Sequence, residues 1–291
     1  FFTFIDTFNE RTELAQRGWN KQKRTDLRQL SLALFEDEAT GLPVYHQCYR
    51  GDRPDVSQFE AAWQGMIRTW MKGFERPPEQ LTLVFDKGNN SKRNLEQLGK
   101  AALRFVGAIP GHWVADLLEV GREEYHKLEL PGSKHLKAYR VRREFSGRER
   151  TLLVVFSPSF YCKQRAVMNR QQAKAEKSIR ELAEAIDRWG ETRRGKGYSR
   201  ASVERKIAEW TARDHLRKFL LTEIEVEDDR VVRLTWNWDL HRKREVQRTW
   251  LGKTVLITDH DAWEDSRIVL AYRKLWKSER MFRISKQGPW W

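Results

Sequence analysis

The N-terminal third of the chain combines short apolar runs with one long helical pattern. Apolar runs predict strands at residues 1–8, 30–36 and 44–49, and a Gly/Pro turn at 39–43 precedes the third strand. Short strands joined by such a turn favour an antiparallel meander. Residues 55–74 repeat apolar side chains at helical spacing, so we expect a helix there.

Strands and helices alternate after the meander. Residues 81–86 form a short apolar run typical of a buried parallel strand, 91–102 predict a helix, and 104–109 predict a further strand. Three antiparallel strands followed by alternating helices and strands are the order of a ribonuclease H-like fold. The pattern therefore predicts an α/β protein with a ribonuclease H-like mixed sheet flanked by helices.

The pattern changes at Pro110, where strongly basic segments begin. Residues 134–150 alternate apolar and basic side chains and lead into a strand at 152–156. Helices at 163–189 and 202–220 are expected next, followed by strands at 223–226 and 231–238. A buried strand at 254–259 and a closing helix from Ser266 complete the chain. We interpret residues 110–250 as a basic, mixed α+β insertion domain. It divides the core into a first part, 1–109, and a closing part, 251–291, which carries the last strand and helix.

Charge narrows the class of partner. The 291 residues carry 55 Lys and Arg against 41 Asp and Glu, a net charge of +14, which favours a polyanion and above all a nucleic acid.

No apolar run is long enough to span a membrane, and no signal peptide is recognisable. Cys48 and Cys162 form no CxxC pair, so we expect a reduced, cytoplasmic protein. Because the chain starts at Phe1 without methionine, we expect it to be the core of a longer protein.

Three carboxylates lie where metal chemistry would need them. Asp6 lies in the first strand, Asp86 ends the fourth, and Glu279 lies on the closing helix. One arc of about 80° on that helix carries Tyr272, Trp276, Glu279, Arg283 and Lys286. A lone carboxylate among cations and rings suits a Mg²⁺ ion beside phosphate. Taken singly, each Asp is equally well explained as a turn or cap residue, and the Glu as a solvated one.

Two sequence blocks resemble those of insertion-sequence DDE transposases. Asp86–Leu95 is similar to the block D-[RK]-G-x-x-S-x-x-N-L around the second catalytic aspartate of that family. Tyr272, Glu279 and Lys286 match its signature Y-x2-R-x3-E-x6-K, although Leu275 replaces the arginine. Weaker similarities to the family's other blocks lie at Gly18–Leu30, at Gly41-Leu-Pro43 and at Gly51–Asp55, where Asp52 replaces an asparagine.

The resemblance implies a set of roles for these residues. Asp6, Asp86 and Glu279 would be the catalytic, metal-binding triad for two Mg²⁺ ions, with Mn²⁺ as a substitute. Tyr272 and Lys286 would hold the terminal phosphates of the DNA. On the helical arc, Arg283 is the best replacement for the missing arginine. The implied partners are double-stranded DNA, as terminal inverted repeats and as target, and a second copy in a synaptic homodimer. The implied location is the bacterial cytoplasm or nucleoid.

The insertion supplies further candidate DNA contacts. Residues 134–150 hold seven Lys and Arg against two acids, and 188–218 hold ten against four. Arg140 and Arg142 represent the first of these segments. In the family a tryptophan of the insertion is associated with a flipped base, and Trp236 and Trp238 are the candidates here. Alternation places both on one strand face, where packing in a core is the competing explanation.

We therefore expect the catalytic core of a transposase, a polynucleotidyl transferase and endonuclease that cleaves DNA at the element ends and transfers the 3′-hydroxyl strand to target DNA. Three alternatives stay open. The first is a catalytically inactive, transposase-derived DNA-binding protein, and the second is a ribonuclease H-like DNA nuclease without strand transfer. The third is a structural or ribonucleoprotein component held by charge alone.

Overall fold

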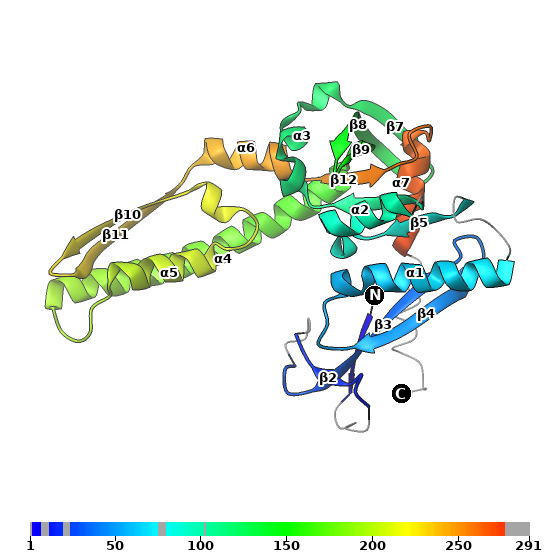
Figure 1. The fold of residues 1–291 in the computed structure, drawn as a ribbon. Coiled ribbons are helices and arrows are strands. Elements are labelled where there is room, and N and C mark those ends of the chain that lie inside the picture. Colours follow the sequence, from blue (N-terminus) through cyan, green and yellow to red (C-terminus); the bar gives the residue numbers. More distant parts are fainter. Residues whose placement is uncertain (1, 7–11, 20–23, 75–79, 102, 277–291) are drawn as a thin grey trace.

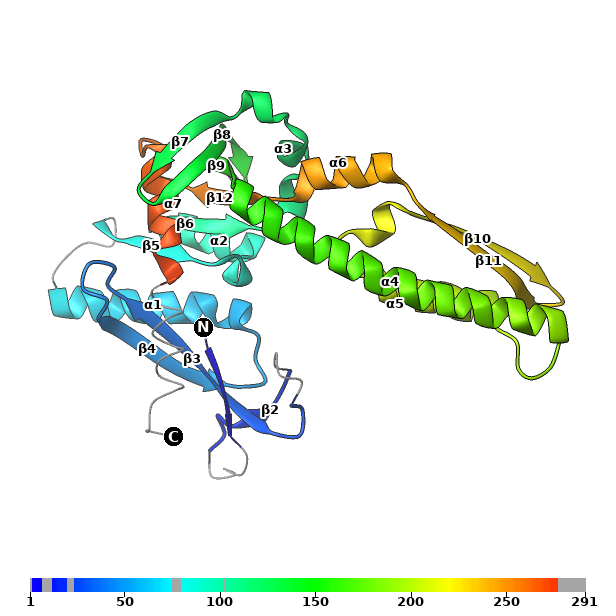
Figure 2. The same cartoon turned by 180° about the vertical axis from the view of Figure 1, so that it is seen from behind.

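Two sheets and a long projecting arm make up the molecule (Figures 1 and 2). The computed structural model describes residues 2–6, 12–19, 24–74, 80–101 and 103–276. The N-terminal sheet contains β1 (Phe2–Asp6), β2 (Gln16–Arg17), β3 (Arg28–Glu36) and β4 (Pro43–Arg50). Strands β1, β2 and β4 all pair antiparallel with β3. This confirms the antiparallel arrangement, whereas the short β2 was not predicted.

Helix α1 (Asp55–Phe74) lies between the two sheets (Figure 1). Phe59 and Trp63 are buried in a cluster with Phe85, which belongs to the second sheet. Ala62 packs instead with Tyr49 and other residues of the N-terminal sheet. The helix thus buries two faces at once, because Ala62 is turned by about 100° around the helix axis from Trp63. Its bounds agree with the prediction.

The second sheet is mixed and has six strands. They are β5 (Thr82–Phe85), β6 (Arg104–Ile109), β7 (His126–Leu130), β8 (Ser133–Phe145), β9 (Arg148–Phe156) and β12 (Lys253–Thr258). The order across the sheet is β5-β6-β12-β9-β8-β7. Only β5 and β6 run parallel to each other, as the sequence predicted, and all other neighbours are antiparallel.

Helices cover both faces of this sheet. On one face, α2 (Lys92–Lys100) and α3 (Ala115–Glu119) pack on the cluster that contains Leu152 and Val154 of β9. On the other face, α7 (Asp265–Arg273) packs on Leu153 of β9 and on its neighbours in β6 and β12. Alternate β9 side chains are therefore buried on both sides. The predicted α/β class with a mixed, helix-flanked sheet is confirmed at this level.

The arm is inserted between two neighbouring strands. Phe156 ends β9 and is the register partner of Lys253, which begins β12. The arm between them consists of α4 (Pro158–Thr192), α5 (Arg200–Trp210), β10 (Leu220–Glu227), β11 (Arg230–Trp238) and α6 (Leu240–Trp250). The 35 residues of α4 give it a length of about 52 Å. Its inner face packs on α5 and on the β10–β11 hairpin through Ile179 and Ile186.

Several elements differ from the sequence prediction, which contained neither α3 nor β7. Helix α5 ends at Trp210 rather than near 220, and it cannot continue to 220 because Asp214 and His215 adopt left-handed conformations with φ of 55° and 61°. Helix α6 was not predicted at all. The closing helix α7 ends at Arg273 and is followed by a turn, and its predicted continuation from residue 277 lies outside the described residues.

Strands β7, β8 and β9 pair in one sheet with β6 and β12, although the sequence interpretation assigned them to the insertion 110–250. The division of the chain into domains stays a prediction. Among the helices that the structure describes, none is both long and apolar enough to cross a membrane.

Candidate catalytic site

Asp86 and Tyr272 meet at the end of β5. The Asp86 carboxylate follows the last β5 residue and caps a short 3-10 turn, where its Oδ1 accepts a hydrogen bond of 2.7 Å from the Lys87 backbone N–H. The same oxygen accepts a second hydrogen bond, 2.9 Å long, from the Tyr272 hydroxyl in the last turn of α7. The two family-like sequence blocks, 186 residues apart, therefore meet in space.

The polar residues of the Asp86 block hold this turn in place. Ser91 caps α2 by accepting a hydrogen bond of 3.0 Å from the Asn94 backbone N–H. The buried Asn94 amide donates to the Asn89 carbonyl at 2.9 Å and to the Val56 carbonyl at 3.0 Å. Asn90 donates to the Ala108 carbonyl of β6. These contacts explain why the block needs short polar side chains. Pattern reasoning on Asp86 alone did not find them.

Asp86 has the donor chemistry that a hard cation requires. Both of its hydrogen bonds end on Oδ1, and within the described part of the chain no donor contacts Oδ2. The side chain is exposed. An exposed carboxylate oxygen without a partner is a suitable ligand for Mg²⁺, which takes one or two carboxylates together with phosphates and waters.

The part of the chain that the structure describes does not show Asp6 or Glu279 beside Asp86. Asp6 is the last residue of β1, where its backbone pairs with Arg28. Strands β1 and β5 belong to different sheets and are not neighbours. Glu279, Arg283 and Lys286 lie outside the described residues. In the ranges that the structure describes, no group of three or more His, Cys, Asp or Glu side chains is placed to hold a metal ion. The triad stays a prediction.

The end of α7 is attached to both sheets. Lys274 forms an ion pair with Glu38, which lies in the turn between β3 and β4. Arg273 donates to the Ser133 hydroxyl at the start of β8. Trp276 is half exposed, with 54% of its surface accessible. The segment that leads toward Glu279 is therefore fixed at its beginning by contacts that a helical pattern does not reveal.

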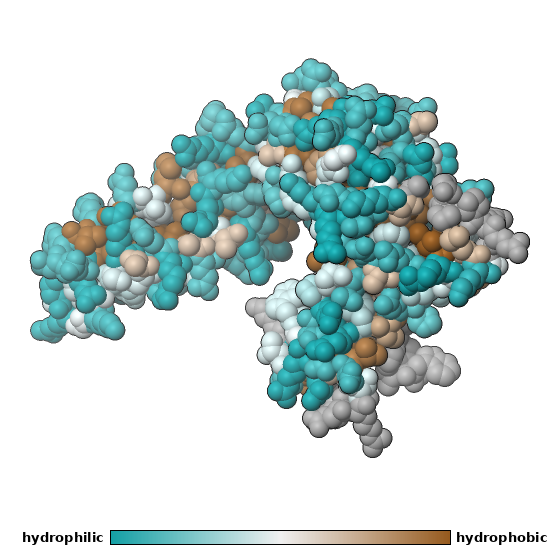
Figure 3. Space-filling model, in the orientation of Figure 1, coloured by the Kyte–Doolittle hydropathy of each residue, from teal (hydrophilic) through white to brown (hydrophobic). Residues whose placement is uncertain are grey.

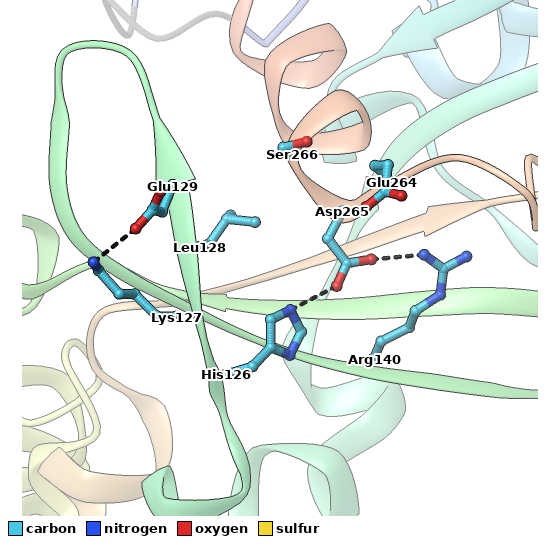
Figure 4. A pocket seen from close by; sticks show the side chains of 8 residues that line it. All are labelled: His126, Lys127, Leu128, Glu129, Arg140, Glu264, Asp265 and Ser266. Atoms are coloured by element: carbon cyan, nitrogen blue, oxygen red, sulfur yellow. Dashed lines mark hydrogen bonds and ion pairs between the residues drawn. The ribbon is translucent and has the colours of Figure 1, made fainter.

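Arg140 lies in a polar pocket at the opposite end of α7 (Figure 4). The pocket has a volume of about 390 Å³ and is lined by His126, Lys127, Leu128, Glu129, Arg140, Glu264, Asp265 and Ser266. Arg140 donates to the largely buried Asp265 carboxylate at 2.7 Å and to the carbonyls of Asp261 and Trp263. His126 Nε2 lies 2.9 Å from the other Asp265 oxygen. The lining charges thus pair with one another and leave no excess for a polyanion.

The remaining DNA-contact candidates also have partners inside the protein. Arg142 forms ion pairs with Asp261 at 3.1 Å and with Glu149 at 3.2 Å. Trp236 and Trp238 share one face of β11, and both are half-buried against the apolar clusters of the arm. The ring of Trp238 lies 5.5 Å from that of Phe219.

A histidine that the sequence did not single out anchors the start of β5. His260 Nε2 lies 2.8 Å from the Thr82 hydroxyl, and the imidazole stacks on Trp263 with the ring centres 3.7 Å apart. Burial, together with the nearby Arg104 and Arg267, lowers the pKa of His260 to about 4. The imidazole is therefore neutral at pH 7.

Comparison with known proteins adds no family assignment. No protein-family model matches the chain, and the search of the curated proteins found no match.

Proposed function

We propose that this chain is the catalytic core of an insertion-sequence DDE transposase, which cleaves DNA strands at element ends and transfers the 3′-hydroxyl strand to target DNA. The observation that carries the proposal is the hydrogen bond between Tyr272 and Asp86. Each residue belongs to a different family-like block, and chance resemblance gives no reason for two blocks so far apart in sequence to be in contact.

In this proposal Asp6, Asp86 and Glu279 hold two Mg²⁺ ions, for which Mn²⁺ is a substitute. When bound, such ions activate the attacking oxygen and stabilise the leaving oxygen at a phosphodiester. The protein's own contribution at Asp86 is orientation, since the Lys87 N–H and the Tyr272 hydroxyl fix Oδ1 and leave Oδ2 toward solvent. Arg283 and Lys286 bind phosphate, and Tyr272 joins them when its hydroxyl, which here donates its one proton to Asp86, turns to a phosphate oxygen.

The proposed ribonuclease H-like fold requires β1 beside β5. In the part of the chain that the structure describes, β1 pairs only with β3 and β5 pairs only with β6. Each strand therefore has one edge without a described partner, although the described residues place the two strands in separate sheets with α1 between them. The partners in the proposal are double-stranded DNA and a second copy of the chain, and the location is the bacterial cytoplasm.

The test is a strand-cleavage assay on a supercoiled plasmid that carries the DNA flanking the gene. Wild type cleaves only with Mg²⁺ or Mn²⁺, and Asp86→Asn and Glu279→Gln each reduce the rate by at least about 100-fold. Asp228→Asn, in the turn of the β10–β11 hairpin, is the matched control and retains the wild-type rate. Undiminished cleavage by the Glu279→Gln variant refutes the proposal.

A catalytically inactive, transposase-derived DNA-binding protein is the second candidate. The separation of β1 and β5 into two sheets favours it. Such a protein binds DNA equally well in EDTA and in Mg²⁺ and never cleaves it. A nuclease without strand transfer is distinguished by a pre-cleaved end with a free 3′-hydroxyl, which a transposase joins to a second duplex and a nuclease does not.

A further inference from the structure

The first half of α4 carries a row of cations on its solvent side. Lys163, Arg170, Lys174 and Lys177 are all exposed, and at 100° per residue they lie within an arc of about 60°. The arc is centred about 150° from Met168, Ala175 and Ile179, through which the helix packs into the arm. We call these four cations the α4 basic stripe. It extends about 21 Å along the helix.

The charges of α4 run against the helix dipole. Residues 158–177 contain five Lys and Arg and one acid, Glu176, which pairs with Arg180 at 3.0 Å. Residues 178–192 contain four acids and two arginines. Because the N-terminal end of a helix favours anions and the C-terminal end favours cations, this order does not stabilise the helix. A merely solvated face would mix both signs along its length. The segregation therefore points to an external anion at the base of the arm.

The stripe faces the hollow between the arm and the N-terminal sheet. The β10–β11 hairpin and α6 lie on the upper side of α4 in both Figure 1 and Figure 2, so the opposite, exposed side is directed downward. Figure 3 shows an open hollow below the arm at that place. A large, extended ligand can therefore reach the stripe.

We infer that the α4 basic stripe binds the phosphate backbone of double-stranded DNA in this hollow. About twelve phosphate charges lie along 21 Å of duplex, which is enough for Lys163, Arg170 and Lys174 and also for Lys177, whose exposed ion pair with Glu181 is 3.9 Å long. Ala166 and Ala173 border the stripe and are exposed, so they leave room for the helix to approach a backbone. The choice of DNA over duplex RNA rests on the proposed function.

Other polyanions fit the stripe less well. A basic amphipathic helix binds a membrane by inserting its apolar face, but the apolar face of α4 is buried against α5, β11 and α6. Single-stranded nucleic acid is held by stacking on aromatic side chains, and residues 162–178 contain none. The stripe also differs from the sequence-predicted DNA segments 134–150 and 188–218, since it belongs to neither.

The experiment compares two triple variants in EDTA, where the metal site cannot act. The stripe variant is Lys163→Gln/Arg170→Gln/Lys174→Gln. The control, Arg68→Gln/Lys72→Gln/Lys100→Gln, removes the same charge from exposed cations of α1 and α2, outside the predicted DNA-contact segments. Binding of a fluorescent 30-base-pair DNA duplex is measured by anisotropy at several salt concentrations, and circular dichroism verifies that both variants retain the wild-type helix content.

The stripe variant should lose at least about tenfold in affinity at 0.1 M salt, and the slope of log affinity against log salt should fall by about 3. The control should stay within about twofold of wild type. Equal loss in both variants, wild-type binding by the stripe variant, tighter binding of duplex RNA, or equal competition by polyglutamate would each overturn the inference. If the stripe variant binds normally while wild type cleaves, only the stripe fails. If wild type binds through the stripe but never cleaves, only the proposed activity fails.

Discussion

Acidification should destabilise the protein through His260. The imidazole is hydrogen-bonded to Thr82 at the start of β5 and stacks on Trp263. The Arg267 guanidinium lies close to this stack, 3.9 Å from the Trp263 ring centre. Arg104 on β6 also lowers the pKa of His260, whereas Asp261 opposes it. Protonation would therefore place a third positive charge, partly buried, beside two arginines.

The sign and size of the effect follow from the pKa values. The pKa of His260 is about 4 in the folded protein, against an ordinary value of 6.5. Between these values the unfolded chain binds more protons, so the free energy of unfolding falls as the pH decreases from 6.5 toward 4. The full difference corresponds to roughly 3 kcal/mol. Because the ring is partly exposed and solvent screens its charge, we expect about 1–2 kcal/mol.

Urea denaturation followed by circular dichroism at pH 7 and pH 4.5 measures this loss. The His260→Gln variant retains a side-chain nitrogen for Thr82 but does not titrate, so wild type should lose about 1–2 kcal/mol more than this variant over the interval. His241→Gln, at a histidine whose side chain is 81% exposed, should behave like wild type. If wild type and His260→Gln lose equal stability, or if NMR titration gives His260 a pKa near 6.5, the reasoning is wrong.

Four further outcomes test other parts of the fold. Burial lowers the pKa of Lys253 to about 8, so between pH 8 and 10 wild type should gain about 2 kcal/mol relative to Lys253→Met, a difference that thermal melts at both pH values will show. Gly51→Ala should destabilise by at least about 2 kcal/mol in urea denaturation, because its Cβ would lie 1.9 Å from the Gln29 carbonyl oxygen. Gly73→Ala meets no atom within 4 Å and should stabilise α1 by about 0.5–1 kcal/mol. Replacing residues 157–252 with Asn-Gly should leave a cooperatively folding core that binds DNA at least about tenfold more weakly in the anisotropy assay, and loss of folding would contradict the arm's insertion into a β9–β12 hairpin.

Sequence patterns located most elements because burial leaves a periodic trace. The predicted bounds of α1 and β6 agree with the structure, since both elements bury a regular set of apolar side chains. Helix α6 left no such trace. Val246 is its only buried residue and cations dominate the rest, so its helical form depends on the Asp239 cap and on packing at the arm base.

The order of strands in the six-stranded sheet was beyond sequence reasoning. Strand β12 pairs with β6 and β9, whose register partners lie 146–152 and 97–107 residues before it in the sequence. Alternation reports which side chains face inward but not which strand lies alongside. The same limit explains why the basic pattern around Arg140 and Arg142 favoured DNA contacts, since the pattern does not reveal their ion-pair partners. Their partners, Asp265 and Asp261, lie more than 100 residues away in the sequence.

The junction between the arm and the six-stranded sheet is fixed by several contacts, and the proposed DNA contacts on α4 are connected to Asp86 through this junction. The Ser157 backbone N–H donates to the Gly252 carbonyl at 2.8 Å, and the Gln164 side chain accepts from the Gly252 N–H at 2.6 Å. The Arg122 guanidinium lies 4.0 Å from the Phe156 ring and packs against the first turn of α4. The base of α4 is therefore fixed to β12, and β12 is joined through β6 to the strand that ends at Asp86. Because hydrogen-bonded neighbouring strands move together, DNA held on the stripe would have a defined position relative to that carboxylate.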